Sequence, residues 1–305
     1  MSQANCTELT DVCTFEVSVY GYQPSLPANA ALLAIFALFA IANVVLGIRY
    51  KTWTYMIAVS LGCLAEAIGY VGRLIMRDNP FADGGFITQI CCLIIAPAFN
   101  SAAIYLVLKH VVLCFGESAS YIRARFYTYI FIAFDILSLV LQGAGGGIAS
   151  TADDEAFRDI GDGLIMAGIA WQVAALSMFA IAAGVYVLRR KRAIPREPLS
   201  EEAVATLNDT KFRLFIAGVF TAWFTIYIRC VYRIVEMAGG WGNSVMRHES
   251  SFIVLEGVMI VIAAGCQTIL HPGWGFPRLS GWGDNRATTY IKSSEETSME
   301  ELRAR

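Results

Sequence analysis

Residues 28–48 read ANAALLAIFALFAIANVVLGI, a run without a charged residue in which almost every side chain is apolar. A helix of about 20 such residues spans the roughly 30 Å hydrocarbon core of a bilayer. Six more windows of this kind follow, separated by short polar connections: 53–75, 86–108, 127–149, 163–188, 212–236 and 252–270. Continuous apolar runs favour helices over barrel strands, because backbone that faces lipid must be hydrogen-bonded within its own segment. We therefore expect an all-α polytopic membrane protein, a bundle of seven transmembrane helices.

The composition agrees with this fold class. Of 305 residues, 56% are hydrophobic and 16% are charged, whereas soluble domains average about 25% charged residues. The formal net charge of −2 gives no general electrostatic reason to expect nucleic acid as a partner. No stretch between the windows is long enough for a second folded domain. We divide the chain into an extracellular N-terminal segment (1–27), the membrane domain (28–273) and a cytoplasmic tail (274–305) that we expect to be disordered.

The charges of the connections predict this orientation. Lysine and arginine gather after the first, third and fifth windows, and Arg189-Arg190-Lys191-Arg192 is the densest run. The connections on the opposite side carry only Arg77, Arg158 and Arg247. Basic connections face the cytoplasm, so we expect the N-terminus outside and the C-terminus in the cytoplasm.

The cysteines do not form a disulfide framework, because most of the eight lie within the apolar windows. Only Cys6 and Cys13 share the oxidising side outside the lipid. A Cys6–Cys13 disulfide and two free thiols are equally compatible with the sequence.

Several ionisable side chains fall inside the predicted helices, where each costs about 2.5–3.5 kcal/mol on insertion scales. They are Glu66 and Arg73 in the second window, Asp135 in the fourth, Arg229, Arg233 and Glu236 in the sixth, and Glu256 in the seventh. Four acids against three arginines are nearly balanced, as expected if the groups pair inside the bundle.

Their spacing places polar side chains on shared helix faces. Glu66, Tyr70 and Arg73 lie at i, i+4 and i+7, and the three charged residues of the sixth window repeat this interval. Further polar side chains at membrane depth are Asn100, Gln172, and the set Asp135, Ser138 and Gln142 at i, i+3 and i+7. We expect these residues to line an intramembrane cavity that is open toward the outside. Helix packing through Glu–Arg pairs alone is the alternative.

Two further features predict how the helices pack. Gly143 and Gly147 form a small-residue motif at the end of the fourth window, which is typical of close helix approach. Pro97 lies in the middle of the third window and predicts a kink, with Asn100 just beyond it.

The sequence argues against several chemistries. It contains no GxxxxGK[ST] phosphate-binding loop, and no lysine lies inside a window to carry a retinal-type Schiff base. His110, His248 and His271 lie at helix ends or in connections on different sides, so they do not converge on a zinc ion. We therefore expect a protein that is not an enzyme and holds no metal.

Several motifs occur in order along the chain. They are Tyr22-Gln-Pro-Ser25, Glu66-Ala-Ile-Gly-Tyr70-Val-Gly-Arg73, Ile95-Ala-Pro-Ala-Phe99, Ala102-Ala-Ile-Tyr105, Asp135-Ile-Leu-Ser138 with Gln142 and Gly145-Gly146-Gly147, Gly168 with Gln172, Ile228-Arg229, Tyr232-Arg233-Ile-Val-Glu236, Glu249 and His271-Pro272-Gly273. Together they resemble the fungal lipid-translocating exporter family, seven-helix proteins also called resistance-to-aminocholesterol-like. The resemblance covers nearly the whole membrane domain. It departs at Glu256, where the family often has Asp, so the charge is kept and the reach differs by one methylene.

The resemblance implies an integral protein of the plasma membrane or an endomembrane that exports amphipathic lipids. Sphingoid long-chain bases and toxic sterol analogues are the implied classes. A carboxylate without an arginine, among Glu66, Asp135 and Glu256, is then a candidate partner for the ammonium group of a long-chain base. The expected partners are membrane lipids and an amphipathic small molecule, and the sequence does not indicate an oligomeric state.

Two alternatives stay open at this point. A seven-helix receptor or sensor for an amphipathic ligand would need the same orientation and the same polar cavity. One branch of the resembling family handles haem and protoporphyrin, and His248, on the predicted outer side, is the candidate axial ligand if haem is a cofactor here.

Overall fold

Seven helices long and apolar enough to cross a membrane make up most of the chain in the computed structural model. The structure describes residues 6, 8–11, 13–151, 154–194, 198–239 and 243–276, and within these ranges it contains helices and no strand. The expected fold class is thereby confirmed. The predicted cytoplasmic tail lies outside the described residues from position 277 onward.

The transmembrane helices coincide with the predicted windows, and each extends beyond its window at one end or at both. They are α1 (Leu26–Tyr50), α2 (Trp53–Asp78), α3 (Asp83–Phe115), α4 (Ala124–Thr151), α5 (Glu155–Ala193), α7 (Thr210–Ala238) and a seventh span made of α8 (Glu249–Phe252), the π-helical segment η3 (Ile253–Val258) and α9 (Met259–Ile269). The connections hold η1 (Phe15–Val17), η2 (Glu117–Ala119), α6 (Glu201–Asn208) and α10 (Pro272–Gly275). Apolar windows miss the extra turns because polar residues beyond the hydrocarbon still continue the helical hydrogen bonds.

Local sequence explains several helix ends. Pro27 stands in the first turn of α1, where its missing N–H is no loss. Lys51, just after α1, takes a left-handed conformation with φ of 56° that ends the helix. Asp209 begins α7 by accepting a hydrogen bond from the Lys211 N–H. Pro97, at which we expected a kink, lies inside α3 without ending it.

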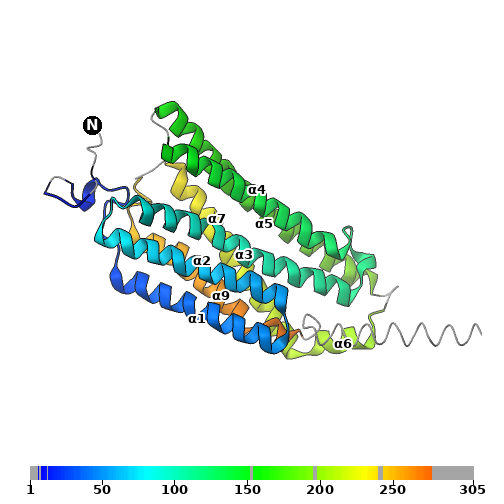
Figure 1. The fold of residues 1–305 in the computed structure, drawn as a ribbon. Helices are drawn as coiled ribbons and strands as arrows, with labels where there is room; N and C mark the ends of the chain where they lie inside the picture. The colour runs from blue at the N-terminus through cyan, green and yellow to red at the C-terminus, as the bar shows by residue number, and fades with distance from the viewer. Residues whose placement is uncertain are drawn as a thin grey trace, which may run out of the picture.

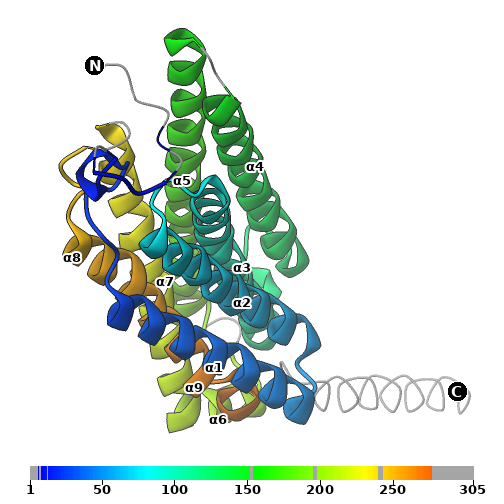
Figure 2. The same cartoon turned by 60° about the vertical axis from the view of Figure 1, so that its left-hand side comes forward.

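The spans form two groups (Figures 1 and 2). Helices α4 and α5 run antiparallel side by side at one edge of the bundle, and α1 lies at the opposite edge. We call α4 and α5 the α4–α5 hairpin, and α1, α2, α3, α7, η3 and α9 the main group. The hairpin contacts the main group through α3 and α7.

Glycine allows α4 to approach α5 closely, but not at the positions that we predicted. A Cβ atom at Gly145 would lie 2.5 Å from the Gly161 carbonyl oxygen of α5. A Cβ atom at Gly143 or Gly147 would meet no atom within 4 Å. The small-residue motif therefore predicted the wrong face of α4 as the one that packs against α5. Gly145, which makes the close approach, lies about 200° around the helix from Gly143.

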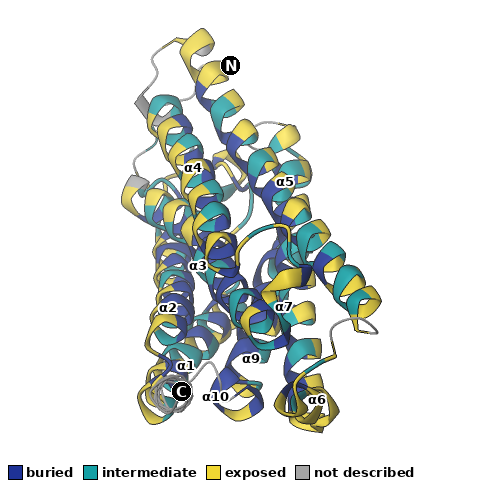
Figure 3. Cartoon of the chain, turned by 90° about the vertical axis from the view of Figure 1, so that its right-hand side faces the viewer, coloured by how far each residue is buried: buried dark blue, intermediate teal, exposed yellow. Residues whose placement is uncertain are grey.

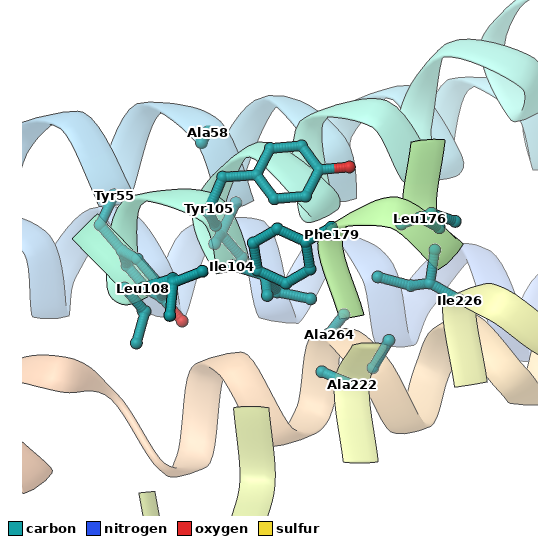
Figure 4. Packing of buried hydrophobic residues seen from close by; sticks show 14 of the residues in the cluster. Tyr55, Ala58, Ile104, Tyr105, Leu108, Leu176, Phe179, Ala222, Ile226 and Ala264 are labelled. Atoms are coloured by element: carbon teal, nitrogen blue, oxygen red, sulfur yellow. The ribbon is translucent and has the colours of Figure 1, made fainter. Parts of the chain in front are cut away.

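Exposed residues follow the outer faces of the helices (Figure 3), and many of the exposed side chains are large and apolar. Leu38, Ile181 and Phe220 are 65%, 66% and 63% exposed, respectively. Such side chains are stable there only in contact with lipid. Inside, apolar side chains of α2, α3, α5, α7 and α9 pack together (Figure 4).

The two ends of the bundle differ. At the basic end, Arg190 donates a hydrogen bond to the Phe115 carbonyl, which joins the ends of α5 and α3. At the N-terminal end, a disulfide joins Cys6 and Cys13, which decides between the two alternatives left open by the sequence. The orientation of these ends across the membrane stays a prediction from the basic connections.

Candidate functional site

Five charged side chains of the main group meet in the interior, and we call them the charged cluster. They are Glu66 from α2, Arg229, Arg233 and Glu236 from α7, and Glu256 from η3. Four of these side chains are at most 2% exposed, and the Arg233 side chain is 13% exposed. The structure therefore brings together charges from three separate segments of the sequence.

Arg229 is the centre of the charged cluster. Its Nη2 atom lies 2.6 Å from Oε1 of Glu256 and 3.9 Å from Oε1 of Glu66. The same nitrogen donates a hydrogen bond to the Leu93 carbonyl of α3. One guanidinium thus connects α2, α3, α7 and η3, and in a low-dielectric interior such a charged hydrogen bond is strong.

Arg233 extends the charged cluster toward the N-terminal end. Its Nη1 atom lies 2.6 Å from Oε2 of Glu236, and its Nε atom lies 3.6 Å from Oε1 of Glu256. Three carboxyl groups therefore share two guanidinium groups. Neither carboxyl oxygen of Glu66 has a hydrogen-bond partner among the described residues, so the excess acid of the cluster is at Glu66.

A π-helical segment positions Glu256. The segment η3 interrupts the seventh span over Ile253–Val258, and such wide turns occur frequently at functional sites. The next residue, Gly257, packs against α2, where a Cβ atom would lie 2.9 Å from the Tyr70 hydroxyl oxygen. Tyr70 is fully buried at the border of the charged cluster, and glycine at 257 permits this close approach.

Arg73 lies apart from the charged cluster, toward the N-terminal end. Its side chain is fully buried, with the guanidinium carbon 3.8 Å from the centre of the Phe252 ring. The rings of Tyr20 and Tyr22 lie 5.2 Å and 5.7 Å away, and Arg73 donates a hydrogen bond to the Tyr22 hydroxyl. Aromatic faces and a hydroxyl therefore compensate this charge in place of a carboxylate.

The N-terminal segment covers this end of the main group. Tyr20 accepts a hydrogen bond of 2.9 Å from the Gln89 side chain, and the Ser25 N–H donates to the Glu249 carboxylate at 2.6 Å. Burial raises the pKa of Tyr20 to about 12, against the opposing effect of Arg73. Burial also raises the pKa of Tyr22. Both tyrosines are therefore neutral hydrogen-bonding groups at physiological pH.

Asp135 forms a second, separate site on α4. It is 3% exposed and forms no ion pair with any described residue. The Tyr105 hydroxyl of α3 lies against the Asp135 carboxyl group and the Ser101 hydroxyl and can share a hydrogen bond with each of them. Ser138 donates to the Asp135 backbone carbonyl at 2.9 Å.

The remaining predicted residues lie at helix interfaces. Gln142 donates to Gln172 at 3.5 Å, which joins the two helices of the α4–α5 hairpin. The backbone carbonyl of Asn100 accepts a hydrogen bond of 2.9 Å from the Gln267 side chain, which joins α3 to α9.

The expectation of one shared, outward-open cavity is met only in part. Five of the predicted residues meet in the charged cluster and Tyr70 borders it, whereas Arg73, Asp135, Asn100 and the glutamine pair occupy other places. The carboxyl groups of the cluster are buried in this conformation, so an opening to the outside is not seen at these side chains.

Sequence reasoning missed the groups that surround Arg73 and Asp135. Tyr20 lies in the polar N-terminal segment, where nothing in the sequence indicates burial. Ser101 and Tyr105 are spaced i, i+4 on α3, and this interval was the available signal for a polar face opposite Asp135.

The candidate metal and haem ligands lie apart in the structure. Within the described ranges, no group of three or more His, Cys, Asp or Glu side chains is placed to hold a metal ion. His248 is exposed at the start of α8. An exposed imidazole at a helix start does not form a haem pocket, so the haem interpretation stays a prediction.

Similar proteins are known from yeast. The model of the family described as "RTA1 like protein" matches residues 59–279. The chain is 30% identical over 286 residues to "Sphingoid long-chain base transporter RSB1" of Saccharomyces cerevisiae, covering 85% of this chain and 75% of that protein. From the same organism, "Protoporphyrin uptake protein 1" is 33% identical over 205 residues (66% and 63% covered), and "Protein RTM1" is 30% identical over 234 residues (74% and 72% covered). No solved structure matches the chain.

Proposed function

Because the chain belongs to the RTA1-like family, we propose that it is a membrane transporter of amphipathic lipids that carry a cationic head group. Sphingoid long-chain bases, which the similar yeast protein is named for, are the first class to test. A long-chain base has one apolar chain, which suits the hydrocarbon, and one ammonium group, which needs a polar path. No chemical conversion of the lipid is part of this function, so the protein is not an enzyme.

The excess of buried acid carries the proposal. The charged cluster has three carboxyl groups for two guanidinium groups, and no described residue donates a hydrogen bond to Glu66. Asp135 has no cationic partner among the described residues. Unpaired carboxylates are costly at membrane depth and mark substrate paths. A cationic head group would supply the missing charge.

The same observation favours an amine over a tetrapyrrole. Protoporphyrin carries two propionate groups, and these anions would face a surplus of carboxylates. Similarity to "Protoporphyrin uptake protein 1" therefore leaves tetrapyrrole transport as the second candidate. The plasma membrane, with the N-terminal end outside, is the proposed location, and a tagged chain imaged in yeast tests it.

Reconstitution of the purified full-length protein in liposomes tests the transport function. A fluorescent long-chain base is placed in one leaflet, and its appearance in the other leaflet is measured. We expect the protein alone to accelerate this movement, Glu66→Gln to slow it, and Glu201→Gln, which changes an exposed carboxylate of α6, to leave it unchanged. A receptor would bind the lipid without moving it, and that outcome would refute the proposal.

A further inference from the structure

Helix α3 packs against α2 and α7 (Figure 1) and contains Pro97 in its interior. Each carbonyl inside an α-helix accepts a hydrogen bond from the N–H four residues later. A proline has no N–H, so Pro97 leaves the carbonyl of Leu93 without its helical donor. From α7, the guanidinium of Arg229 donates to this same carbonyl. The break in the hydrogen bonds of α3 therefore lies at the charged cluster.

The hydrogens of one arginine nitrogen are fully used there. Nη2 of Arg229 carries two hydrogens, and it donates one bond to the Leu93 carbonyl and one, of 2.6 Å, to Oε1 of Glu256. Glu66 lies 3.9 Å from the same nitrogen, which is beyond hydrogen-bond distance. No described residue donates a hydrogen bond to Glu66. The Leu93 carbonyl thus competes with Glu66 for the second hydrogen of Nη2.

Close packing of α2 on α3 brings Glu66 to this arginine. Gly69 follows Glu66 by three residues, on the same face of α2. A Cβ atom at Gly69 would lie 2.7 Å from Cδ2 of Leu93. Glu66 and Leu93 are both fully buried, so bulk water does not reach either residue in this conformation. The acid of α2 and the free carbonyl of α3 are therefore held at one guanidinium.

We infer that Pro97 is a positioning residue of the charged cluster: by freeing the Leu93 carbonyl, it holds Arg229 on α3 and keeps Glu66 available for the ammonium group of the lipid. This inference rests on the proposed transport function. In Pro97→Ala the N–H returns, and the carbonyl turns back along the helix axis to accept it. The second hydrogen of Nη2 then bonds to Glu66, and the guanidinium competes with the ammonium group for that carboxylate.

A bend in α3 is the simpler role of Pro97. A bend shapes the path of any lipid, whereas the freed carbonyl acts through Arg229 and Glu66 and so affects only a charged head group. The two roles therefore predict different lipid selectivity. Removing a proline from a helix interior favours the helix, and a bond to Glu66 replaces the arginine bond that is lost. Pro97→Ala is therefore not expected to lower Tm.

Two probe lipids separate these roles. One is a fluorescent sphingoid base with its free amine, and the other is the same lipid with an N-acetyl group, which is neutral. Affinity and transport of both are measured with the full-length wild-type protein, Pro97→Ala, Pro97→Ser, Glu66→Gln and the double variant Pro97→Ala with Glu66→Gln. The matched control is Pro27→Ala, because Pro27 stands in the first turn of α1, where a proline frees no helical carbonyl.

We expect the wild-type protein and Pro27→Ala to bind the amine more tightly than the N-acetyl lipid. Pro97→Ala is expected to weaken amine binding roughly threefold to tenfold and to leave binding of the N-acetyl lipid unchanged. Pro97→Ser also restores the N–H and is expected to match it. Glu66→Gln removes the acid on which Pro97 acts, so the double variant is expected to show the same amine preference as Glu66→Gln alone.

Three results overturn the inference. An unchanged amine preference in Pro97→Ala shows that the Leu93 carbonyl does not control Glu66. Equal loss of both lipids assigns Pro97 to the bend alone, and a further loss of preference in the double variant shows that Pro97 does not act through Glu66. If Pro97→Ala does not fold, the same comparisons with Pro97→Ser decide. If the wild-type protein moves neither lipid, or both equally, the proposed function fails; if it prefers the amine and both proline variants do so equally, only the inference fails.

Discussion

Replacing Arg229 by methionine is expected to destabilise the bundle strongly. The change removes the guanidinium that lies 2.6 Å from Glu256 and donates to the Leu93 carbonyl. Glu256 then keeps only Arg233, at 3.6 Å, and Glu66 keeps no cation within 4 Å. Breaking a buried ion pair by removing one partner costs about 3–5 kcal/mol, because the remaining charge stays buried.

A double-mutant cycle in thermal unfolding measures this pair. Arg229→Met, Glu256→Gln and the double variant are compared with the wild-type protein in the same detergent. At about 2 °C per kcal/mol for a chain of this size, Arg229→Met is expected to lower Tm by about 6–10 °C. The double variant no longer buries a carboxylate at position 256 and leaves only Glu66 without its cation, so we expect it to be more stable than the sum of the single changes by about 2–3 kcal/mol.

The matched control is Arg213→Met on the same helix. Arg213 is exposed near the start of α7, and its replacement is expected to cost less than about 1 kcal/mol. Two results would refute the reasoning: a Tm for Arg229→Met no lower than that for Arg213→Met, or single effects that simply add in the double variant.

Three further changes address other parts of the bundle. Tyr22→Phe removes the acceptor for Arg73 and is expected to speed proteolytic cleavage of the N-terminal segment; unchanged cleavage would contradict this role. Gly145→Leu places a side chain against the α5 backbone and is expected to lower Tm, whereas Gly143→Leu, which faces open space, is not. Burial lowers the pKa of His271 from 6.5 to about 4, so the unfolded chain binds a proton between these values that the folded chain does not. The contribution of neutral His271 to the free energy of unfolding is fully present above about pH 6.5 and falls by about 3 kcal/mol as the pH drops through 4. Thermal unfolding scans at pH 7 and pH 4 are therefore expected to show a larger loss of stability for the wild-type protein than for His271→Gln.

The fold was predictable because a membrane span depends on one local property. The run 28–48 is apolar over its whole length, and no knowledge of its neighbours is needed to see that it crosses a bilayer. Interruptions of the regular α-helix within a span are harder to predict from the sequence. Nothing in the sequence around Glu256 indicates that η3 widens into a π-helical segment, because that geometry depends on packing against α2 and α7.

The sequence predicts which polar residues belong to the candidate site, but it does not predict which of them contact one another. Glu66 and Arg73 share a helix face, but seven residues separate them by roughly 10 Å along the axis. They therefore meet different neighbours, Arg229 in one case and Tyr22 with Phe252 in the other. Which acid meets which arginine depends on the depth and rotation of the neighbouring helices, and periodicity within one helix carries no information on either.

Substitutions at Arg229 and at Asp135 are expected to have different effects on the stability of the protein. Arg229 compensates buried acid, so its loss is expected to lower stability and transport together, and transport must be normalised to folded protein. Asp135 has no cationic partner among the described residues, and its replacement by a neutral side chain of the same shape removes a buried acid that no described cation compensates. Asp135→Asn is therefore expected to hold or raise Tm while amine selectivity falls, since groups kept for binding are retained at a cost in stability. Loss of selectivity together with a higher Tm separates a ligand site from a packing residue, because a packing residue would lose both.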